Sequence, residues 1–392
     1  PGNAAFHSSN MQALNRSKAE APAPPPEKIL QFGGGNFLRA FADWMIDLMN
    51  ERLDYGAGVL IVKPTPGGDY RTLEAQEGLY HVYLRGRQEG SVTEQYRLIG
   101  CVSRSLHPYE DYGAFLHSAE QASIELIISN TTEAGIAFRE DDRLTDQPAH
   151  SFPGKLTQWL YHRYRYFGGH SEVGCTILPT ELIDDNGARL RHYVQRYARR
   201  WELEAGFHEW LEAHNDFCNT LVDRIVPGFP EDAAAIQEQL GFRDRLLVTG
   251  EPYHLWAIEG TARSRQRFPA DQAGLNVRYV DDLSAIRTLK VRLLNGAHTA
   301  MVPLGLLAGI ESVGEGIADP TLGPFIEELL HQEIIPTLPH PATEAGAYAQ
   351  DVLERFANPF IHHRLADIAL NSSAKFASRL QPSLEIAYRQ SG

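Results

Sequence analysis

The sequence predicts an α/β protein in which a domain built on a parallel sheet precedes a mostly α-helical C-terminal domain. Three observations support this fold class. A strand, a glycine-rich turn, a helix and a second strand follow one another from residue 29; strand-like and helix-like segments alternate up to about residue 246; and helical patterns dominate after it. Strands that alternate with helices form parallel sheets covered on both faces, so the first domain is expected to be Rossmann-like. The expected boundaries are a disordered tail over 1–27, the Rossmann-like domain over 28–246 and the helical domain over 247–392.

The individual elements follow from apolar patterns and from turn residues. Residues 29–32 form an apolar run that enters three glycines, a helical pattern covers 36–51, and 58–62 is a second apolar run between glycine and proline. Further elements of the first domain are strands at 80–84, 124–129 and 173–178 and helices at 109–119, 155–166 and 188–201. In the second domain strand-like runs nearly disappear, and helices are expected at 283–307, 322–333, 345–356 and 364–379.

Composition and charge limit the possible partners. A chain of 392 residues with 43% hydrophobic residues can build two cores. The formal net charge of −14 and the lack of a long Lys/Arg run make nucleic acid an unexpected partner. We see no signal peptide, no run of about 20 apolar residues and no paired spacing of the three cysteines, so a cytoplasmic protein without membrane contact is expected. Residues 1–27, rich in Ala, Pro, Ser and Asn, are expected to form a mobile tail.

Gly33, Gly34 and Gly35 mark the place where a dinucleotide could bind. At a turn from strand to helix, a pyrophosphate can contact exposed backbone N–H groups and the positive end of the helix dipole. The usual GxGxxG pattern is incomplete because Leu38 takes the place of the third glycine, and a glycine-rich loop without a ligand is the alternative.

Two further segments bear on a cofactor. The acidic residue expected to hold the adenosine ribose is missing after the second strand, because Val62 is followed by Lys63; the residues alone therefore leave NAD and NADP open. Thr131, Thr132 and Glu133 follow the strand at 124–129, where they could contact the nicotinamide half of a cofactor or serve as ordinary turn residues.

Lys290, Asn295 and His298 stand on one predicted helix. At about 100° per residue, His298 lies roughly 80° and Asn295 roughly 140° around the helix from Lys290, so the three groups can share one side. Reduction of a ketone needs a hydride and a proton, and a lysine in a buried setting can carry that proton in either direction. An amide can stabilise the developing oxyanion and a histidine can bind a neighbouring hydroxyl. A solvated helix face is the alternative reading of these residues.

Several segments resemble a known family. KVRLLNGAHTAMVPLGLLAG at 290–309 resembles the signature of the mannitol dehydrogenase family, the long-chain polyol-specific dehydrogenases and reductases, and QFGGGNFLRAF at 31–41 is similar to the nucleotide loop of that family. Other similar segments follow in the order of the family from residue 28 to the C-terminus: SNTTEAGI at 129–136, FPGKLTQWLY at 152–161, ILPTELIDDNG at 177–187, FCNTLVDRIVPG at 217–228 and ALNSSAKFASRLQP at 369–382.

The resemblance implies an NAD-dependent enzyme that acts on CH–OH groups, with tagaturonate and altronate as the expected pair and fructuronate or another polyol as alternatives. It implies that Lys290 is the general acid/base, that Asn295 belongs to an oxyanion site and that His298, Asp223 and Lys375 contact the substrate. The residues that it implies at the cofactor are Gly33, Gly34, Gly35, Asn36, Phe37 and Arg39.

Two departures from the family pattern concern the substrate. Thr180, Glu181 and Leu182 stand where polyol dehydrogenases have Cys-Asp-Asn, so a second oxyanion amide is absent and Asn295 acts alone, with Glu181 or with a water. The substrate-binding arginine of the family is Asp367 here. The cation that would bind a uronate carboxylate is left open, with Arg364, Lys375 and Arg39 as candidates.

Two rival classes can be weighed. A zinc enzyme is disfavoured because His208 and His214 are six residues apart, whereas the HExxH pattern places two histidines four apart on one helix face. A catalytically silent sensor of sugar acids or nucleotides would also keep the fold, and turnover of any uronate or polyol would exclude it. The sequence leaves the oligomeric state open.

Overall fold

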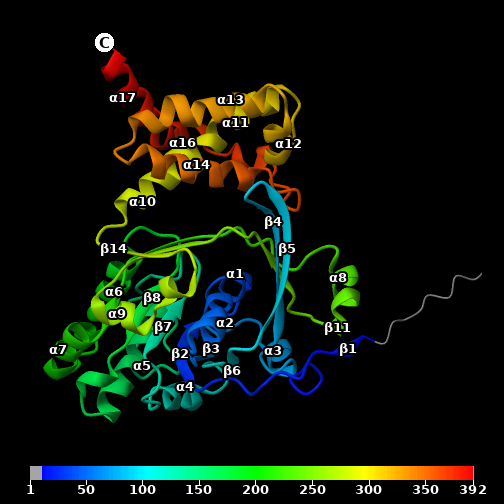
Figure 1. Cartoon of the computed structure of the whole chain (residues 1–392). Coiled ribbons are helices and arrows are strands. Elements are labelled where there is room, and N and C mark those ends of the chain that lie inside the picture. Colours follow the sequence, from blue (N-terminus) through cyan, green and yellow to red (C-terminus); the bar gives the residue numbers. More distant parts are fainter. Residues whose placement is uncertain (1–10, 392) are drawn as a thin grey trace, which may run out of the picture. The chain divides into compact units, whose positions relative to one another are not determined.

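The computed structural model describes residues 11–391, and the chain forms two compact units (Figure 1). The first, here called the Rossmann unit, contains the residues up to Tyr83, Tyr96–Gly250 and His254–Asp281. The second, the helical unit, contains Leu84–Gln95, Glu251–Tyr253 and the residues from Asp282 on.

The centre of the Rossmann unit is a six-stranded sheet in which all neighbouring strands are parallel. Its order is β6-β3-β2-β7-β8-β9, with β2 (Glu27–Phe32), β3 (Gly58–Val62), β6 (Val102–Leu106), β7 (Leu126–Ser129), β8 (Thr176–Pro179) and β9 (Asp216–Phe217). β3 is buried along its whole length, as expected of a strand covered on both faces. The predicted parallel sheet is thus confirmed.

Helices cover both faces of this sheet. On one face, Leu30, Leu60 and Ile127 share a core with Trp159 and Leu190 from two of the helices. On the other face, Gln31 of β2 bonds to Asp43. The helices of the unit are α1 (Asn36–Ala40), α2 (Ala42–Leu53), α3 (Arg71–Ala75), α4 (Tyr112–Ser118), α5 (Phe152–Tyr166), α6 (Asn186–Arg200), α7 (Ala205–His214), α8 (Ala233–Leu240) and α9 (Ala262–Arg267).

The expectation that strands nearly disappear after residue 247 is wrong. A second sheet has the order β10-β13-β14, and β13 pairs antiparallel with β10 so that Asp223 lies opposite Leu255. These contacts place residues 254–281 in the Rossmann unit, so the division differs from the expected boundary at 246. The other strands are β1 (Gln12–Ala13), β4 (Tyr80–Gln88), β5 (Ser91–Ile99), β10 (Thr220–Asp223), β11 (Phe242–Arg243), β12 (Val248–Gly250), β13 (Leu255–Glu259) and β14 (Val277–Val280).

The segment 11–27 is ordered, in contrast to the expected mobile tail. β1 pairs in parallel with β11, and Leu14 is buried. The guanidinium of Arg16 donates to the carbonyls of Pro22, Glu77, Gly100 and Val102. One arginine thus ties the segment to Glu77 and to the stretch from Gly100 to Val102, which its Ala/Pro-rich composition does not reveal. Residues 1–10 lie outside the described residues.

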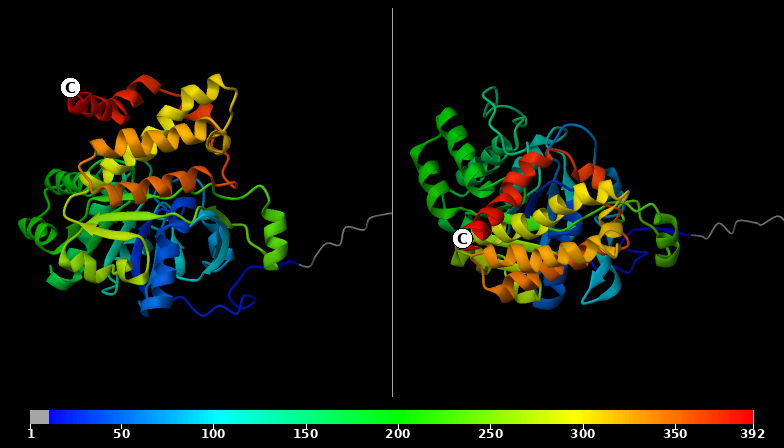
Figure 2. Two further views of the ribbon diagram at one scale, coloured as in Figure 1. Left: turned by 45° about the horizontal axis from the view of Figure 1, so that its top comes forward. Right: turned by 90° about the horizontal axis from the view of Figure 1, so that it is seen from above.

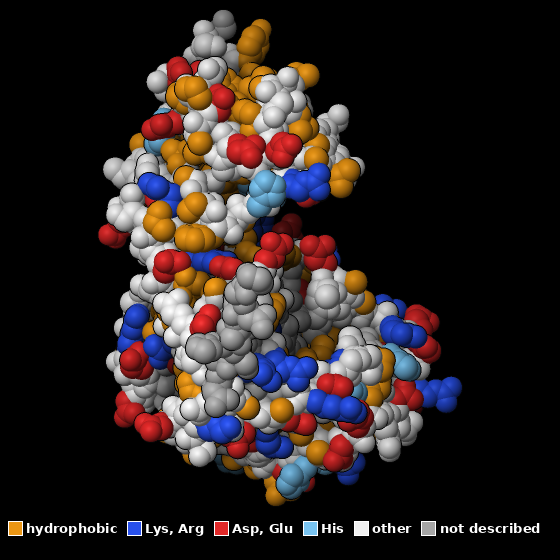
Figure 3. Space-filling model, turned by 90° about the vertical axis from the view of Figure 1, so that its right-hand side faces the viewer, with side chains coloured by type: hydrophobic (Ala, Val, Ile, Leu, Met, Phe, Trp, Pro, Cys, Tyr) orange, Lys and Arg blue, Asp and Glu red, His pale blue; other side chains and the backbone are white. Residues whose placement is uncertain are grey.

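The helical unit has its own apolar core, which includes Leu293, Ala297, Met301 and Ile326. The buried Glu251 and Arg355 form a bidentate ion pair that ties the short segment 251–253 to this unit. Figure 2 shows its helices packed side by side, and Figure 3 shows apolar side chains that remain exposed on them. The helices are α10 (Ser284–Leu289), a π-helix (Lys290–Asn295), α11 (Gly296–Leu307), α12 (Val313–Ala318), α13 (Leu322–Glu328), a second π-helix (Leu329–Ile334), a 3₁₀ turn (Ile335–Thr337), α14 (Ala342–Phe356), α15 (Leu365–Ile368), α16 (Ser372–Arg379) and α17 (Gln381–Ser391). Within residues 11–391, the helices are too short or too polar to span a membrane.

Candidate active site

The glycine turn lies at the point where the order of the sheet reverses. The chain runs from β2 outward through β3 to β6, and β7 then pairs with the other side of β2. Open α/β sheets bind ligands outside the carboxyl ends of their strands at such a switch point. Gly33–Gly35 follow β2 and Asn130–Glu133 follow β7, so the structure brings these two predicted segments together.

The spaces around the three glycines fit a closely approaching ligand. Gly33 has φ of +113°, and a Cβ built there would lie 2.7 Å from the carbonyl oxygen of Asn130. A Cβ on Gly34 would lie 3.1 Å from both Ile61 and Tyr70, whereas a Cβ on Gly35 would meet no atom within 4 Å. The fold therefore requires glycine at position 33 and leaves little room for a side chain at position 34, whereas Gly35 leaves open space beside the start of α1, where a pyrophosphate fits.

Arg39 supports the turn from inside. Its side chain is 6% exposed and donates to the carbonyl of Gly34 at 3.1 Å and to the side-chain oxygen of Asn36 at 2.8 Å. A third bond reaches the carbonyl of Leu246. Phe37 stacks on Phe41, with ring centroids 4.8 Å apart. Among the predicted cofactor residues, Arg39 thus holds the backbone of the turn, while the exposed Asn36 lies at its surface.

A buried polar group lies beneath the turn. The amide nitrogen of Gln31 donates both to the carbonyl of Gly33 at 3.0 Å and to the carboxyl of Asp43 at 3.1 Å. Tyr80 donates to the carbonyl of Arg39 at 2.9 Å and reaches the same carboxyl at 3.4 Å. Burial raises the pKa of Asp43 to about 7, although the bond from Gln31 and the charge of Arg39 oppose this. Because C=O and N–H of a trans peptide point in opposite directions, bonds to the carbonyls of Gly33 and Gly34 turn the next two amides toward the ligand side.

Asp43 should make the free energy of unfolding depend on pH. Between about pH 4 and 7 the folded protein holds a proton on this carboxyl that the unfolded chain has lost, which lowers stability by about 1.4 kcal/mol per pH unit as pH rises. We expect Asp43→Asn to gain stability relative to the unsubstituted protein over this range, with the gain levelling off above pH 7. Urea unfolding at several pH values measures the difference.

Asp47→Asn is the matched control for this prediction. Asp47 lies one turn further along α2, where its carboxylate accepts bonds from Arg97 and from the backbone of Gly100. Its substitution removes one carboxylate from the same helix, so the effect of Asp43→Asn is read as its difference from Asp47→Asn at each pH. A pH-independent difference between Asp43→Asn and the unsubstituted protein would contradict the prediction.

Glu181 holds the segment after β7. Its carboxylate is 2% exposed and accepts bonds from the Ser129 hydroxyl at 3.0 Å and from both the backbone and the hydroxyl of Thr131 at 3.1 and 3.0 Å. Burial raises the pKa of Glu181, while these bonds act in the opposite direction. Thr132 has φ of +73°, which is rare for a β-branched residue. The structure thus places Glu181 as a support of the Thr131 segment, with Thr132 and Glu133 exposed.

The loop after β3 contains an acidic residue, Asp69, that the sequence analysis did not single out. Lys63 is 5% exposed, and its ammonium donates to the carbonyl and hydroxyl of Thr65 at 2.9 and 3.0 Å. The loop after β3 then folds back toward the sheet. Burial lowers the pKa of the Lys63 ammonium, Asp69 lies close enough to oppose this, and the Tyr70 hydroxyl forms a hydrogen bond with the backbone of Gly34. Asp69 is exposed, and the next residue, Tyr70, packs against Gly34. The Gly67-Gly68 pair before it was the available signal, since two glycines favour a chain reversal.

The helix that carries Lys290 and Asn295 is not a regular α-helix. Residues 290–295 form a π-helix, in which the N–H of each residue bonds to the carbonyl five residues earlier. Residues five apart therefore lie closer together around the helix axis than the about 140° that separates them in an α-helix. The structure thus brings Lys290 and Asn295 to one side more closely than the sequence predicted. Single π turns are frequent at functional sites.

His298 follows three residues later on α11 and is fixed by aromatic rings. Its ring is stacked on Phe356, with centroids 4.4 Å apart and planes 17° apart, and meets the edge of His363 at 5.1 Å. Burial lowers the pKa of His363, while the charge of Asp367 opposes it. Since residues three apart on a helix are neighbours, His298 continues the side formed by Lys290 and Asn295.

Two other predicted substrate residues have structural contacts. The ammonium of Lys375 donates to the carbonyl of Ile368 at 2.7 Å, which satisfies the end of α15. Asp223 is 8% exposed at the end of β10, in the Rossmann unit. The next residue, Arg224, donates to the carbonyl of Ala40 at the end of α1. Arg364 is exposed at the start of α15.

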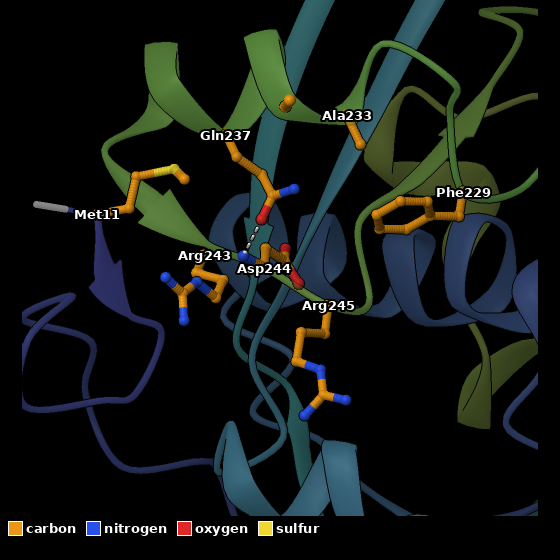
Figure 4. A pocket seen from close by; sticks show the side chains of 8 residues that line it. Met11, Phe229, Ala233, Gln237, Arg243, Asp244 and Arg245 are labelled. Carbon is orange, nitrogen blue, oxygen red and sulfur yellow. Dashed lines mark hydrogen bonds between the residues drawn. The ribbon is translucent and has the colours of Figure 1, made fainter. Parts of the chain in front are cut away.

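An open, largely apolar pocket of about 560 Å³ lies elsewhere in the Rossmann unit (Figure 4). Phe229, Arg243 and Arg245 line it, and the backbone of Asp244 donates to the side chain of Gln237. None of the predicted site residues lines this pocket, and Met11 at its edge borders residues outside the described part of the chain. We therefore assign it no ligand.

A Rossmann-type sheet with a glycine turn at its switch point, followed by a helical domain, defines a dinucleotide-dependent dehydrogenase. The chain belongs to the mannitol dehydrogenase family: residues 27–272 match the mannitol dehydrogenase Rossmann domain and residues 282–392 match the mannitol dehydrogenase C-terminal domain. It is accordingly an oxidoreductase that acts on CH–OH groups, with a Rossmann domain of the kind that binds a dinucleotide.

Individual relatives agree with this assignment. The chain is 46% identical over 383 residues to the altronate oxidoreductase of Bacillus subtilis (strain 168) and 45% identical over 384 residues to that of Yersinia pestis, in each case over 97% of this chain and 79% of the relative. The fold is shared with a D-sorbitol dehydrogenase, at a TM-score of 0.80 and 22% identity over 97% of this chain and 82% of that chain. It is also shared with the mannitol 2-dehydrogenase of Pseudomonas fluorescens, at a TM-score of 0.68 and 23% identity over 95% and 80%.

Proposed function

We propose that the protein reduces tagaturonate to altronate with NADH and catalyses the reverse oxidation with NAD. The observation that carries this proposal is the identity of 44–46% with proteins named altronate oxidoreductase over 97% of the chain. The departures from the polyol dehydrogenase pattern at Leu182 and Asp367 support a substrate other than mannitol.

In this proposal Lys290 is the residue that donates a proton to the carbonyl oxygen, and Asn295 donates a hydrogen bond to the same oxygen as charge develops on it. NADH supplies the hydride when it is bound at the glycine turn. His298 orients a neighbouring hydroxyl of the substrate, and its contact with Phe356 keeps its ring in one position. We retain Asp223 and Lys375 as further substrate contacts, since two of the three ammonium hydrogens of Lys375 stay available beside its bond to Ile368. Glu181 contributes through the Thr131 segment that it holds.

A kinetic panel tests the substrate. Tagaturonate, fructuronate, fructose and mannitol would each be assayed with both nicotinamide cofactors, in the appropriate direction, by absorbance at the reduced-nicotinamide band. The highest kcat/KM should be found with tagaturonate and NADH. A preference for fructuronate or for an uncharged polyol would reassign the substrate, and no turnover of any of the four would favour a non-catalytic sensor.

Asp69 should determine the choice between NAD and NADP. A carboxylate beside the adenosine ribose favours NAD because it can accept hydrogen bonds from the ribose hydroxyls and repels a 2′-phosphate. We expect Asp69→Asn to weaken NADH binding by about tenfold, as expected for loss of a hydrogen bond to a charged group, and to improve NADPH binding. Fluorescence titration with the two reduced cofactors measures both. Glu74→Gln, on the exposed side of α3, serves as the control, and an unchanged NADH/NADPH ratio in Asp69→Asn would exclude this role.

A further inference from the structure

The helical unit contains two partly buried arginines that have no carboxylate partner among residues 11–391. Arg292 donates to the hydroxyl of Ser383 at 3.0 Å, and Arg379 donates to the hydroxyl of Thr299 at 3.2 Å. Burial lowers the pKa of both guanidinium groups, and no acidic group opposes it in either case. Each guanidinium makes one bond to a hydroxyl and keeps other N–H groups that could bind an anion from outside the chain.

Only Arg379 borders the side of the helix that carries the proposed chemistry. Its partner Thr299 comes four residues after Asn295, and residues four apart on a helix are neighbours on one side. The chain of α16 also lies against this turn, because a Cβ on Gly296 would lie 3.5 Å from the carbonyl oxygen of Arg379. Arg292 follows Lys290 by two residues, which do not face the same way, and its guanidinium bonds to Ser383 of α17 and not to a residue of α11.

The other candidate cations are less suited to a carboxylate. Arg364 is exposed at the start of α15, where solvent screens its charge. The ammonium of Lys375 already bonds to the carbonyl of Ile368. Arg39 belongs to the Rossmann unit and uses its guanidinium on three oxygens of the glycine turn and its surroundings. The position where the family has a substrate-binding arginine is Asp367, which would repel a carboxylate.

We infer that Arg379 binds the carboxylate of the sugar-acid substrate and so determines the preference for acids over neutral polyols. This inference rests on the proposed function, because it assigns to one residue the charge recognition that a uronate requires. A guanidinium presents five N–H groups in a planar fork that matches a carboxylate with two parallel bonds. The bond to Thr299 uses one of these groups and holds the fork in place, and the remaining groups are available to the substrate.

The inference is tested with Arg379→Gln, which keeps a hydrogen-bond donor but removes the charge. We expect the KM for tagaturonate and the dissociation constant of altronate to rise on the order of tenfold to a hundredfold, as for loss of a charge-assisted bidentate contact. The dissociation constant of NADH and the kinetic constants for any neutral polyol should change by less than about twofold. Arg379→Lys keeps the charge without the planar fork, so its KM for tagaturonate should lie between those of the unsubstituted protein and Arg379→Gln.

Arg292→Gln is the matched control, since Arg292 is also partly buried and also bonds to a side-chain hydroxyl, that of Ser383. Its KM for tagaturonate should stay close to that of the unsubstituted protein. Equal effects of the two substitutions, or an effect of Arg379→Gln on neutral polyols as large as on the uronate, would overturn the inference.

Calorimetric titration separates this inference from the proposed reaction. If the unsubstituted protein turns over no uronate, the proposed function fails, and binding of altronate is then compared directly between the unsubstituted protein and Arg379→Gln. Absence of altronate binding to the unsubstituted protein, or identical binding to both proteins, overturns the assignment of Arg379.

Discussion

Lys290→Met is expected to lower kcat by about 10²- to 10⁴-fold, the range that a positioned general acid contributes. The methionine side chain is of similar length but cannot donate a proton to the carbonyl oxygen. The dissociation constant of NADH should be nearly unchanged, because Lys290 is proposed to act on the carbonyl oxygen of the substrate and not to bind the cofactor. Steady-state rates at the reduced-nicotinamide band and a fluorescence titration with NADH measure the two quantities.

Lys290→Arg distinguishes proton transfer from simple charge. A guanidinium keeps the positive charge at this position but stays protonated, so it can stabilise an oxyanion without completing the proton transfer. We expect kcat of this variant to stay close to that of Lys290→Met. Near-normal turnover of Lys290→Met would refute the catalytic role. If kcat of Lys290→Arg returned to that of the unsubstituted protein, Lys290 would act through its positive charge and not through proton transfer.

Gly33→Ala is expected to weaken NADH binding by at least tenfold and to lower the free energy of unfolding by about 1 to 3 kcal/mol. An alanine at this position would have to adopt a φ of +113°, and its Cβ would lie 2.7 Å from the carbonyl oxygen of Asn130. Because this oxygen follows β7, relief of the contact must move the ends of β2 and β7 apart, where the cofactor binds. Titration with NADH and urea unfolding measure the two effects.

Gly35→Ala is the natural comparison, since a Cβ at this position would meet no atom within 4 Å. Its stability should remain within about 0.5 kcal/mol of the unsubstituted protein, as for most surface substitutions. If Gly35→Ala weakens NADH binding without a loss of stability, the added Cβ occupies space that the bound cofactor needs. Unchanged NADH binding in both variants would place the cofactor elsewhere.

Local patterns predicted the first part of the fold well. The order of strand, glycine turn, helix and strand from β2 to β3 follows from residues close together in sequence, and the β3 range was correct to the residue. The later strands escaped prediction because β13 is short and depends on pairing with β10, more than 30 residues earlier. The N-terminal segment 11–27 is ordered by contacts of Arg16 with residues as distant as Val102, which composition does not encode.

The candidate site was predicted as a set of residues, but not as an arrangement. Family resemblance singled out Lys290, while the π-helix that aligns it with Asn295 depends on packing and has no sequence pattern that we could read. Arg379 meets Thr299 across 80 positions of the chain, so no local motif joins them. Arg39 was predicted among the cofactor residues, and its bonds to Gly34 and Asn36 could not be predicted. The residues next to it in the sequence do not distinguish an arginine that contacts a ligand from one that supports the backbone.

The π-helix at 290–295 amounts to one residue more than a regular helix would need over the same turn. The register between Lys290 and the residues that follow it therefore depends on the number of residues in this stretch as much as on their identity. A related chain that lacked one of them could keep the helix and its core, yet its lysine would be rotated by about 100° away from the amide and the imidazole. Length variation at this place would then separate active enzymes from inactive homologues in which all three side chains are still present.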